Sequence, residues 1–181
     1  MRTLTVKELM VPLAQYATVS EDATLLEAVI ALKKAQEGFD QTRYRHRAIL
    51  VLDKDNHIVG KLSQHDVIKA LEPSYRKVQE LESLGRFGIS SELLKSMLEQ
   101  YSLWDKPIEH LCEAAAKQQV REIMYTPSEG EYIGEPDSIG EAIHRLVVGQ
   151  HHSLIVTRSH DIVGILRLTD VFALVSQTIV K

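Results

Sequence analysis

Hydrophobic and polar residues follow the same order twice along the chain. Residues 24–32 (TLLEAVIAL) and 138–146 (SIGEAIHRL) place apolar side chains at helical spacing. Each segment begins with a Thr or Ser and has a Glu three positions later. This combination is typical of a capping box at the start of an amphipathic helix. The two predicted boxes are Thr24 with Glu27 and Ser138 with Glu141.

Two short apolar runs follow each predicted helix, with turn-forming polar residues between them. The runs are AILVLD and HIVGKL in the first half, and SLIVT and DIVGIL in the second half. They predict a pair of strands, and a second helix follows as VIKAL or VFALVSQTIV. A further short stretch, YATVS or EYIGE, precedes each capping box. Each half is therefore predicted to be strand, helix, strand, strand, helix.

The two halves are copies of one unit. VKELM at 6–10 matches VREIM at 120–124, and IVG at 58–60 matches IVG at 162–164. A unit of roughly 60 residues buries little surface alone, so two copies packed sheet to sheet would share one core. The predicted fold class is α/β (α+β), a pseudo-twofold pair of β-α-β-β-α repeats. We expect the first repeat at 1–72, a helical insertion at 73–118 and the second repeat at 119–181.

The insertion has the apolar spacing of helices. GISSELLKSMLEQY and DKPIEHLCEAAAKQQ each place apolar residues on one helical face. In the second of these, Ile108, Leu111, Cys112 and Ala115 form the stripe, which predicts a buried structural thiol at Cys112. We favour a helical hairpin packed on the edge of the pair. The alternative is a surface for a partner chain, formed by Phe87, Tyr101 and Trp104.

Composition bounds the possible functions. The 181 residues are 44% hydrophobic with a net charge of -4, as in an ordinary globular protein, which argues against binding to duplex nucleic acid. A single cysteine excludes an internal disulfide framework and fits a reducing compartment. The N-terminal residues lack the apolar core of a signal peptide, and no run reaches the length of a membrane span. We expect a cytoplasmic protein that does not contact the membrane.

The duplicated unit resembles a known family, the tandem cystathionine-β-synthase (CBS) domain pair, also called a Bateman module. The resemblance is carried by VKELM and VREIM, by HR and HH before the second strands, and by the Gly-x-x-Ser/Thr-x-x-Asp phrase after them. It implies a non-catalytic sensor, commonly of AMP, ADP, ATP or S-adenosylmethionine, and frequently a homodimer. No cofactor would be required, and an adenine nucleotide would be the regulatory ligand.

The repeated phrase places one carboxylate after each second strand. Gly60 and Gly164 are predicted to end a strand where a side chain would block close approach, and Asp66 and Asp170 fall in the first turn of the next helix. A carboxylate there can accept two hydrogen bonds from the vicinal hydroxyls of a ribose. The alternative is that Ser63 and Asp66 only cap the helix. We favour ribose binding for both aspartates, chiefly because of the family resemblance.

The remaining candidate residues follow from the resemblance. His46-Arg47 and His151-His152 stand where the family faces a ligand's phosphates, and protonation of the histidines would strengthen that attraction. No carboxylate or cysteine accompanies them at metal-ligand spacing, so we predict no metal. Each cleft would draw on both repeats. The first would combine Ser63, Asp66, His46 and Arg47 with the backbone near Tyr132 and Ile133; the second would combine Asp170, Arg167, His151 and His152 with Thr18 and Val19.

Arg167 separates the two clefts, because it stands where the first repeat has Ser63. Its guanidinium could form an ion pair with Asp170 and close the cleft to ribose, or turn outward to a phosphate. We therefore expect Asp66 to belong to the more conventional adenosine site.

The leading functional hypothesis is a stand-alone regulatory module that binds an adenine nucleotide and signals to an unidentified effector protein. The alternatives are a structural dimerisation module with degenerate clefts, or binding of S-adenosylmethionine or NAD. We predict no enzymatic activity, since the sequence has no nucleophile-base pair, no Walker loop and no GxGxxG phrase.

Overall fold

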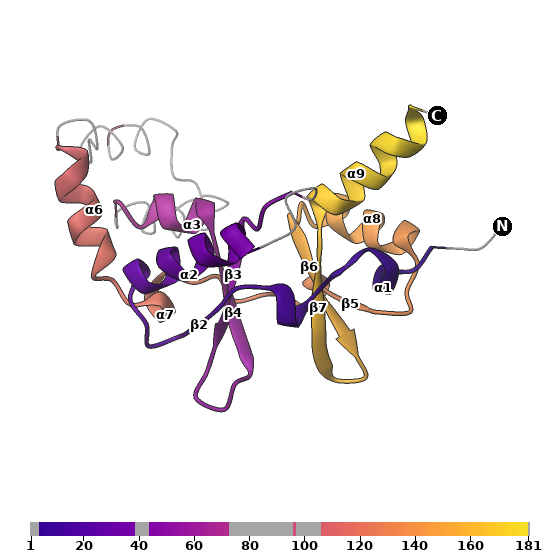
Figure 1. Cartoon of the computed structure of the whole chain (residues 1–181), viewed down its shortest axis with the longest axis horizontal. Helices are drawn as coiled ribbons and strands as arrows, with labels where there is room; N and C mark the ends of the chain where they lie inside the picture. The colour runs from indigo at the N-terminus through magenta and orange to yellow at the C-terminus, as the bar shows by residue number, and fades with distance from the viewer. Residues whose placement is uncertain (1–3, 39–43, 73–95, 97–105, 181) are drawn as a thin grey trace.

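The computed structural model describes residues 4–38, 44–72, 96 and 106–180. Each repeat forms the predicted series of strand, helix, strand, strand, helix, and the two small sheets lie side by side with their helices on the same side (Figure 1). The first repeat contains β2 (Thr18–Ser20), α2 (Leu25–Gly38), β3 (Ala48–Leu52), β4 (Ile58–Ser63) and α3 (Gln64–Lys69). The second contains β5 (Tyr132–Gly134), α8 (Ile139–Val148), β6 (Ser153–Arg158), β7 (Asp161–Arg167) and α9 (Leu168–Ile179).

Short elements surround the repeats: α1 (Val6–Leu9), β1 (Val11–Pro12), η1 (Leu13–Gln15), α6 (Ile108–Ala116), α7 (Val120–Ile123) and η4 (Glu129–Glu131). The sheets have the strand orders β2-β3-β4 and β1-β7-β6-β5. In each repeat the first strand runs parallel to the second, because a helix returns the chain, and the last two strands form an antiparallel hairpin. Both hairpins have a register shift at equivalent places, after Val51 and after Val156.

The two predicted capping boxes form to different extents. The Glu27 carboxylate accepts from Thr24 N at 2.7 Å, and Glu27 N donates to Thr24 Oγ1 at 3.3 Å, which completes the first box. In the second, Ser138 Oγ accepts from Glu141 N at 3.1 Å, but the Glu141 carboxylate binds Arg145 Nη2 at 2.6 Å. A full second box was therefore the wrong prediction, because a cation one turn later competes for the carboxylate.

The two sheets pack against each other through a shared core, as predicted. Val11, Tyr16, Leu50, Ile155 and Ile165 form this cluster. Each repeat also has its own core beneath its helices. Burial of the shared cluster means that the relative position of the repeats is fixed by side-chain packing, in addition to the chain connections.

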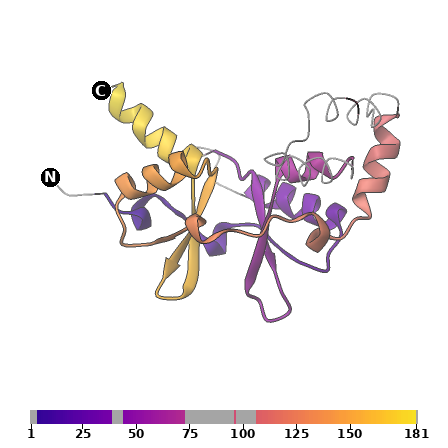
Figure 2. The same ribbon diagram turned by 180° about the vertical axis from the view of Figure 1, so that it is seen from behind.

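The segments that lead into the two repeats are exchanged between them. Val6, at the start of the first copy, is fully buried in the core of the second, and its N–H donates to Asp137 O at 2.9 Å. Val120, at the start of the second copy, lies in the core of the first and donates to Ala23 O at 2.8 Å. Figures 1 and 2 show α1 beside α8 and α7 beside the first repeat. Each repeat is thus completed by a segment that the sequence order assigns to the other.

Two glycines make this exchange possible. Gly60 and Gly164 lie inside β4 and β7, and not at the strand ends that the sequence suggested. A Cβ at Gly164 would lie 2.5 Å from Val11 O, and one at Gly60 would lie 2.6 Å from Met124 Sδ and 3.2 Å from Tyr125 O. The predicted close approach is therefore made by the exchanged segments.

The described part of the insertion, α6, packs on the first repeat. Leu111 and Ala115 are buried there, and Gln118 Nε2 donates to Ala70 O at 2.7 Å. Ile108 and Cys112 are exposed, so the expected four-residue stripe and the buried thiol were wrong; the contact is narrower than the helical pattern suggested. The helix expected within 88–101, and the partner surface suggested for Phe87, Tyr101 and Trp104, fall on residues outside the described ranges apart from Ser96.

Candidate functional site

Asp66 is positioned by the junction of β4 and α3. Ser63 ends the strand and caps the helix with extended backbone angles, φ -88° and ψ 165°. Asp66 Oδ2 accepts from Ser63 N at 2.9 Å and from Ser63 Oγ at 2.6 Å, and Asp66 N donates to Ser63 Oγ at 3.2 Å. Oδ1 accepts no hydrogen bond from the described residues, and the side chain is half-buried. The cap therefore uses one carboxylate oxygen and leaves the other without a hydrogen bond from the described residues.

Asp170, the equivalent residue of the second repeat, is bound on both oxygens. Arg167 Nε donates to Oδ2 at 2.5 Å and Nη2 donates to Oδ1 at 2.6 Å, a bidentate pair. Both residues are buried, at 4% and 5% exposure. Arg167 Nη1 also donates to Tyr44 O at 2.7 Å. Of the two arrangements open to Arg167, the structure has the ion pair.

His46 lies against Arg167, the residue that sequence reasoning assigned to the other cleft. Its Nδ1 is 3.4 Å from Arg167 Nη1, and its ring centroid lies 4.6 Å from that of Tyr16 in an edge-on arrangement. The sheets face each other, so the segment before β3 reaches the second repeat. His46 is fully buried. Its neighbour Tyr16 is buried as well, and this burial raises the pKa of the Tyr16 hydroxyl to about 12. This histidine therefore belongs to the interior that surrounds the Arg167 pair.

The other predicted cations lie at the surface or near it. Arg47 and His152 are exposed, and their carbonyl groups accept from Gln64 N and Leu168 N at the starts of α3 and α9. His151 is half-buried, and its Nε2 lies 3.8 Å from the position of a Cβ built on Gly130. The structure thus separates the members of both predicted pairs, because neighbouring residues here point in different directions.

The predicted backbone positions lie in the first strand of each repeat. Thr18 and Val19 pair with Leu50 and Val51 in the first sheet. Tyr132 and Ile133 pair with Ile155 and Val156 in the second. Tyr132 O accepts from Arg145 Nη1 at 2.6 Å, and Ile133 O accepts from Thr157 Oγ1 at 3.3 Å. The carbonyl groups of both residues therefore have side-chain partners within the second repeat.

Sequence reasoning missed a polar network beside Ser63. Lys61 Nζ forms an ion pair with Glu131 Oε2, and Tyr125 Oη donates to Glu131 Oε1 at 2.6 Å. Ser128 N also donates to Glu131 Oε1, at 3.1 Å. Glu131 is fully buried, and Lys61 Nζ lies 5.1 Å from the centroid of the Tyr125 ring. The network joins β4 of the first repeat to the segment that enters the second.

Burial and hydrogen bonding act in opposite directions on Glu131. Burial is the largest single influence and opposes ionisation, but hydrogen bonds from Lys61, Tyr125 and Ser128 together hold the pKa of Glu131 below its usual value. The pKa of Tyr125 is raised, first because its hydroxyl donates to Glu131, then by burial, with a smaller contribution from the charge of Asp66. Glu131 is therefore an ionised group in the interior, and Asp66 lies close enough to influence Tyr125.

The second repeat has apolar residues at the positions of this network. The alignment of the copies places Ile165 opposite Lys61 and Val11 opposite Tyr125, and both lie in the shared core. The difference between GKL and GIL in the repeated phrase marks Lys61 as the exception in an otherwise apolar pattern. That comparison of the copies was the signal from which the network could have been found.

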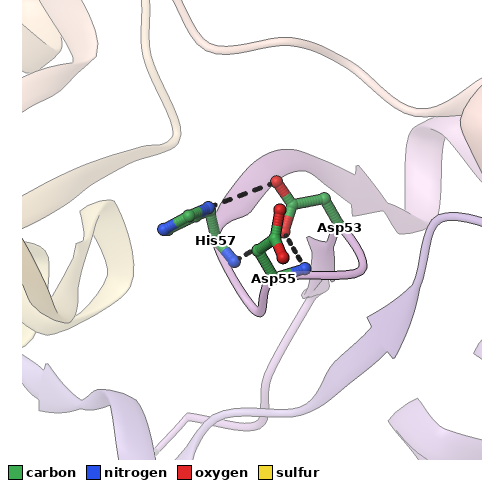
Figure 3. A group of neighbouring side chains, drawn as sticks. All are labelled: Asp53, Asp55 and His57. Atoms are coloured by element: carbon green, nitrogen blue, oxygen red, sulfur yellow. Dashed lines mark hydrogen bonds and ion pairs between the residues drawn. The ribbon is translucent and has the colours of Figure 1, made fainter.

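A carboxylate-rich turn connects β3 and β4. Asp53, Asp55 and His57 lie close together there, with possible ligand atoms within 4.8 Å of one another (Figure 3). Asp53 Oδ1 accepts from Asp55 N at 2.9 Å and from His57 N at 2.8 Å, and the hydrogen bond from His57 N is the main cause of the lowered pKa of Asp53. Asn56 has φ 63°, typical of a tight turn. These hydrogen bonds explain why the three residues lie together, since they stabilise the turn that closes the hairpin.

The helices leave an open apolar groove on the first repeat. It lies between α2 and α3, has a volume of about 460 Å³, and is lined by Val29, Leu32, Lys33, Gln36, Gln64, Val67 and Ile68. On the second repeat, Val148 of α8 and Phe172 of α9 are 70% and 61% exposed. Among the described helices none is both long enough and apolar enough to cross a membrane.

Comparison with known proteins gives one family and many structures of the same fold. The CBS domain family model matches residues 6–73 and 120–177. No curated protein sequence matches the chain. The fold is similar to the CBS domain of a CBS domain containing membrane protein from Sphaerobacter thermophilus, with 23% identity over 96% of this chain and 88% of that one, and a TM-score of 0.59.

Two further solved structures extend the comparison. A CBS domain-containing protein of unknown function from Bacillus anthracis is 17% identical over 96% of this chain and 94% of its own, with a TM-score of 0.61. CBSX2, solved in complex with AMP, is 16% identical over 96% of this chain and 97% of its own, with a TM-score of 0.58. At these identities the likeness concerns the fold.

Proposed function

The chain belongs to the CBS domain family, and we propose that it is a regulatory module that binds one adenosine-containing nucleotide per chain, at Asp66. The proposed ligand class is AMP, ADP or ATP. Support comes from the carboxylate of Asp66, which keeps Oδ1 for a ribose hydroxyl while Oδ2 caps α3. The structural neighbour CBSX2 is described as a complex with AMP, which adds support for this ligand class.

One observation carries the proposal that the two clefts differ. Arg167 binds both oxygens of Asp170 and is itself buried, so the second carboxylate has the partner that a ribose would otherwise provide. Replacing a bidentate guanidinium by two neutral hydroxyl groups would leave a buried cation without its partner, which is costly. The first cleft is therefore the proposed ligand site.

Isothermal titration of AMP, ADP and ATP into the wild type and two variants tests the proposal. Asp66→Ala should weaken the best ligand at least tenfold, because it removes the ribose acceptor. Glu27→Ala is the matched control, since Glu27 is also the carboxylate of a capping box in the first repeat but lies at the start of α2. Unchanged affinity in Asp66→Ala, or no binding of any nucleotide to the wild type, would contradict the proposal.

A second candidate function is a structural dimerisation module. It is favoured by the exposed apolar side chains on α8 and α9, of which Val147, Val148 and Phe172 are each more than 60% exposed. A thermal-shift screen with AMP, ADP, ATP, NAD and S-adenosylmethionine separates the two functions. A ligand at 100 times its dissociation constant should add about 2.7 kcal/mol to stability, and a purely structural module should show no shift with any of the five.

The module would act on an effector protein through a change at its surface. We propose that it is a homodimer, that it has no catalytic activity of its own, and that nucleotide binding alters the relative position of the repeats. The Lys61–Glu131 pair spans the first repeat and the segment leading to the second, next to the proposed site. A ligand at Asp66 would therefore contact a connection between the repeats.

A further inference from the structure

His46 lies between the two repeats and is fully buried. Its backbone belongs to the first repeat, where its carbonyl oxygen accepts from Gln36 Nε2 of α2 at 2.6 Å. Its ring contacts the end of β7 in the second repeat, with Nδ1 3.4 Å from Arg167 Nη1. The same guanidinium nitrogen donates to Tyr44 O at 2.7 Å. The segment before β3 is therefore held on the second repeat by two contacts with one arginine.

The contact with Arg167 requires a neutral imidazole. A guanidinium can only donate hydrogen bonds, so Nδ1 of His46 accepts with its lone pair and carries no proton. Protonation of Nδ1 would place a donor opposite a donor and a second positive charge beside the first. Both residues are buried, so water and salt would screen the repulsion between the two cations only weakly. A protonated His46 therefore has to leave this contact.

The charged and titratable groups around the ring come from three parts of the chain. Tyr16, from the segment before β2, packs edge-on against the ring, and burial raises its pKa to about 12, so its hydroxyl stays neutral near neutral pH. Asp170, from α9, has both carboxylate oxygens on the guanidinium, in a pair with no net charge. Arg45 and Arg47, the sequence neighbours, are exposed and positive. Among the described residues of this cluster, His46 is therefore the group whose charge changes near neutral pH.

The segment that carries His46 also supports the junction of β4 and α3. Arg47, the next residue, accepts at its carbonyl oxygen from Gln64 N at 2.9 Å, at the start of α3. Gln64 follows Ser63, whose N–H and hydroxyl both donate to Asp66 Oδ2. Displacement of the segment would therefore reach the capped carboxylate through one residue of chain and one backbone hydrogen bond.

We propose that the contact of His46 with Arg167 is a proton-sensitive connection between the repeats, which opens when His46 is protonated and then weakens ligand binding at Asp66. The effect on binding rests on the proposed function. A histidine released from the contact titrates at about pH 6.5, so acidification from about pH 7.5 to about pH 5.5 favours the open form by at most about tenfold. The direction is opposite to the one predicted from the sequence, in which protonated histidines attract a ligand's phosphates.

Proton–nitrogen NMR spectra of the ligand-free full chain test the connection itself. In the wild type, the Gln64 amide resonance should move between about pH 7.5 and about pH 5.5 with the same midpoint as the His46 imidazole. His46→Asn places an amide oxygen near the position of Nδ1 and cannot be protonated, so the movement should disappear. His144→Asn is the matched control, because His144 is exposed on α8, and it should keep the wild-type response.

Isothermal titration with AMP at the same two pH values measures the effect on the proposed site. From the higher to the lower pH, the affinity of the wild type should fall by about three- to tenfold more than that of His46→Asn. The phosphate of AMP also titrates, at about pH 6, but this affects both proteins equally and cancels in the comparison. His144→Asn should lose as much affinity as the wild type.

A Gln64 resonance that does not follow the titration of His46 overturns the proposal, and this outcome needs only the wild type, so it remains decisive if His46→Asn does not fold. A wild-type affinity that falls no more than that of His46→Asn overturns the effect on binding. If AMP binding depends on Asp66 in either case, the proposed function stands. If the spectra respond as expected but the wild type binds no nucleotide, the proposed function fails and the proton-sensitive connection stands.

Discussion

Single residues make the two repeats unequal, and Lys61 is the clearest case. It stands where Ile165 fills the shared core, so an ammonium group has replaced an apolar contact. The charge is tolerated because Glu131 and the Tyr125 ring surround it. A buried ion pair adds little stability relative to an apolar pair, but removal of one partner leaves the other charge buried alone. The pair should therefore affect the free energy of unfolding mainly when one of its two side chains is removed.

A double-mutant cycle tests this account. Lys61→Met should lower the free energy of unfolding by about 3 kcal/mol, because Glu131 keeps its charge in the interior without the ammonium. The double variant with Glu131→Gln should recover a large part of that loss, as measured by urea denaturation. If the two single effects simply add, Lys61 and Glu131 are not coupled.

Ionisation of Glu131 should contribute to the pH dependence of the free energy of unfolding. Its pKa in the folded protein lies below the unfolded value of 4.5, so the ionised form is favoured by folding. The resulting stabilisation is complete above pH 4.5 and is lost as the pH falls through the lower folded value. Denaturation between pH 6 and 3 should show a shallower decline for Glu131→Gln than for the wild type. An equal slope would contradict the lowered pKa.

Residue-scale prediction from sequence succeeded where the partners are close along the chain. Ser63 and Asp66 are three positions apart, so the cap follows from the pattern alone. The Arg167–Asp170 pair has the same spacing and was one of the two arrangements that the sequence left open. The contact of His46 with Arg167 spans 121 positions and depends on how the repeats face each other. Lys61 and Glu131 are likewise 70 positions apart. No local pattern specifies such pairs.

Elements followed the sequence closely, because their signals are local. Alternating apolar strands and capped amphipathic helices give the β-α-β-β-α order directly from periodicity. The exchange of α1 and α7 was not foreseen, since VKELM and VREIM have the same apolar pattern and fit either core. Only the glycines opposite them, Gly60 and Gly164, show how tightly these segments are held.

Substitution of Gly164 should loosen the second repeat. A Cβ there would lie 2.5 Å from the backbone oxygen of Val11, which cannot move without displacing β1. Gly164→Ala should therefore cost about 1–3 kcal/mol in thermal or chemical unfolding, the usual effect of overpacking. Gly38→Ala is the control, because no atom of the described residues lies within 4 Å of its added Cβ, and it should be neutral or slightly stabilising. Equal stability of both variants would contradict the close contact.

At the scale of the whole molecule, the duplicated fold has approximate twofold symmetry while its chemistry does not. One junction of strand and helix has a serine cap with a half-buried aspartate, and the other has a buried guanidinium pair. The asymmetry should determine how many ligands one chain binds. It was visible in the sequence as Ser63 against Arg167, although the direction of the Arg167 side chain was not.

Arg167→Ser should give the second repeat the cap of the first. With the guanidinium removed, Asp170 can take the position of a capping carboxylate and offer its second oxygen to ribose. Titration with AMP should then show two sites per chain instead of one. The additional Asp66→Ala change should remove one of the two and leave the other. A stoichiometry of one in Arg167→Ser would show that the rest of the second cleft is also unsuited to the ligand.

The exposed helices should determine the oligomeric state. Phe172 of α9 is 61% exposed and lies near the exposed Val175, so a charge there would be buried in a dimer but solvated in a monomer. Phe172→Glu should convert a homodimer to monomers in light scattering at micromolar concentration. Gln177→Glu, an exposed position of the same helix, should leave the dimer intact. A wild-type monomer would rule out the proposed dimer itself.

The exchange of α1 and α7 also sets the order in which the chain can reach its native state on the ribosome. The first repeat is synthesised up to residue 72 before the segment at 120–125 that completes its core exists. At ordinary rates of translation this interval is about 3–10 s, long compared with local helix and hairpin formation. The nascent first half must therefore persist with an unfilled core edge, and the earliest-made segment, α1, must wait for the last-made sheet. Binding of a chaperone, or local collapse of the nascent chain, can take place in that interval.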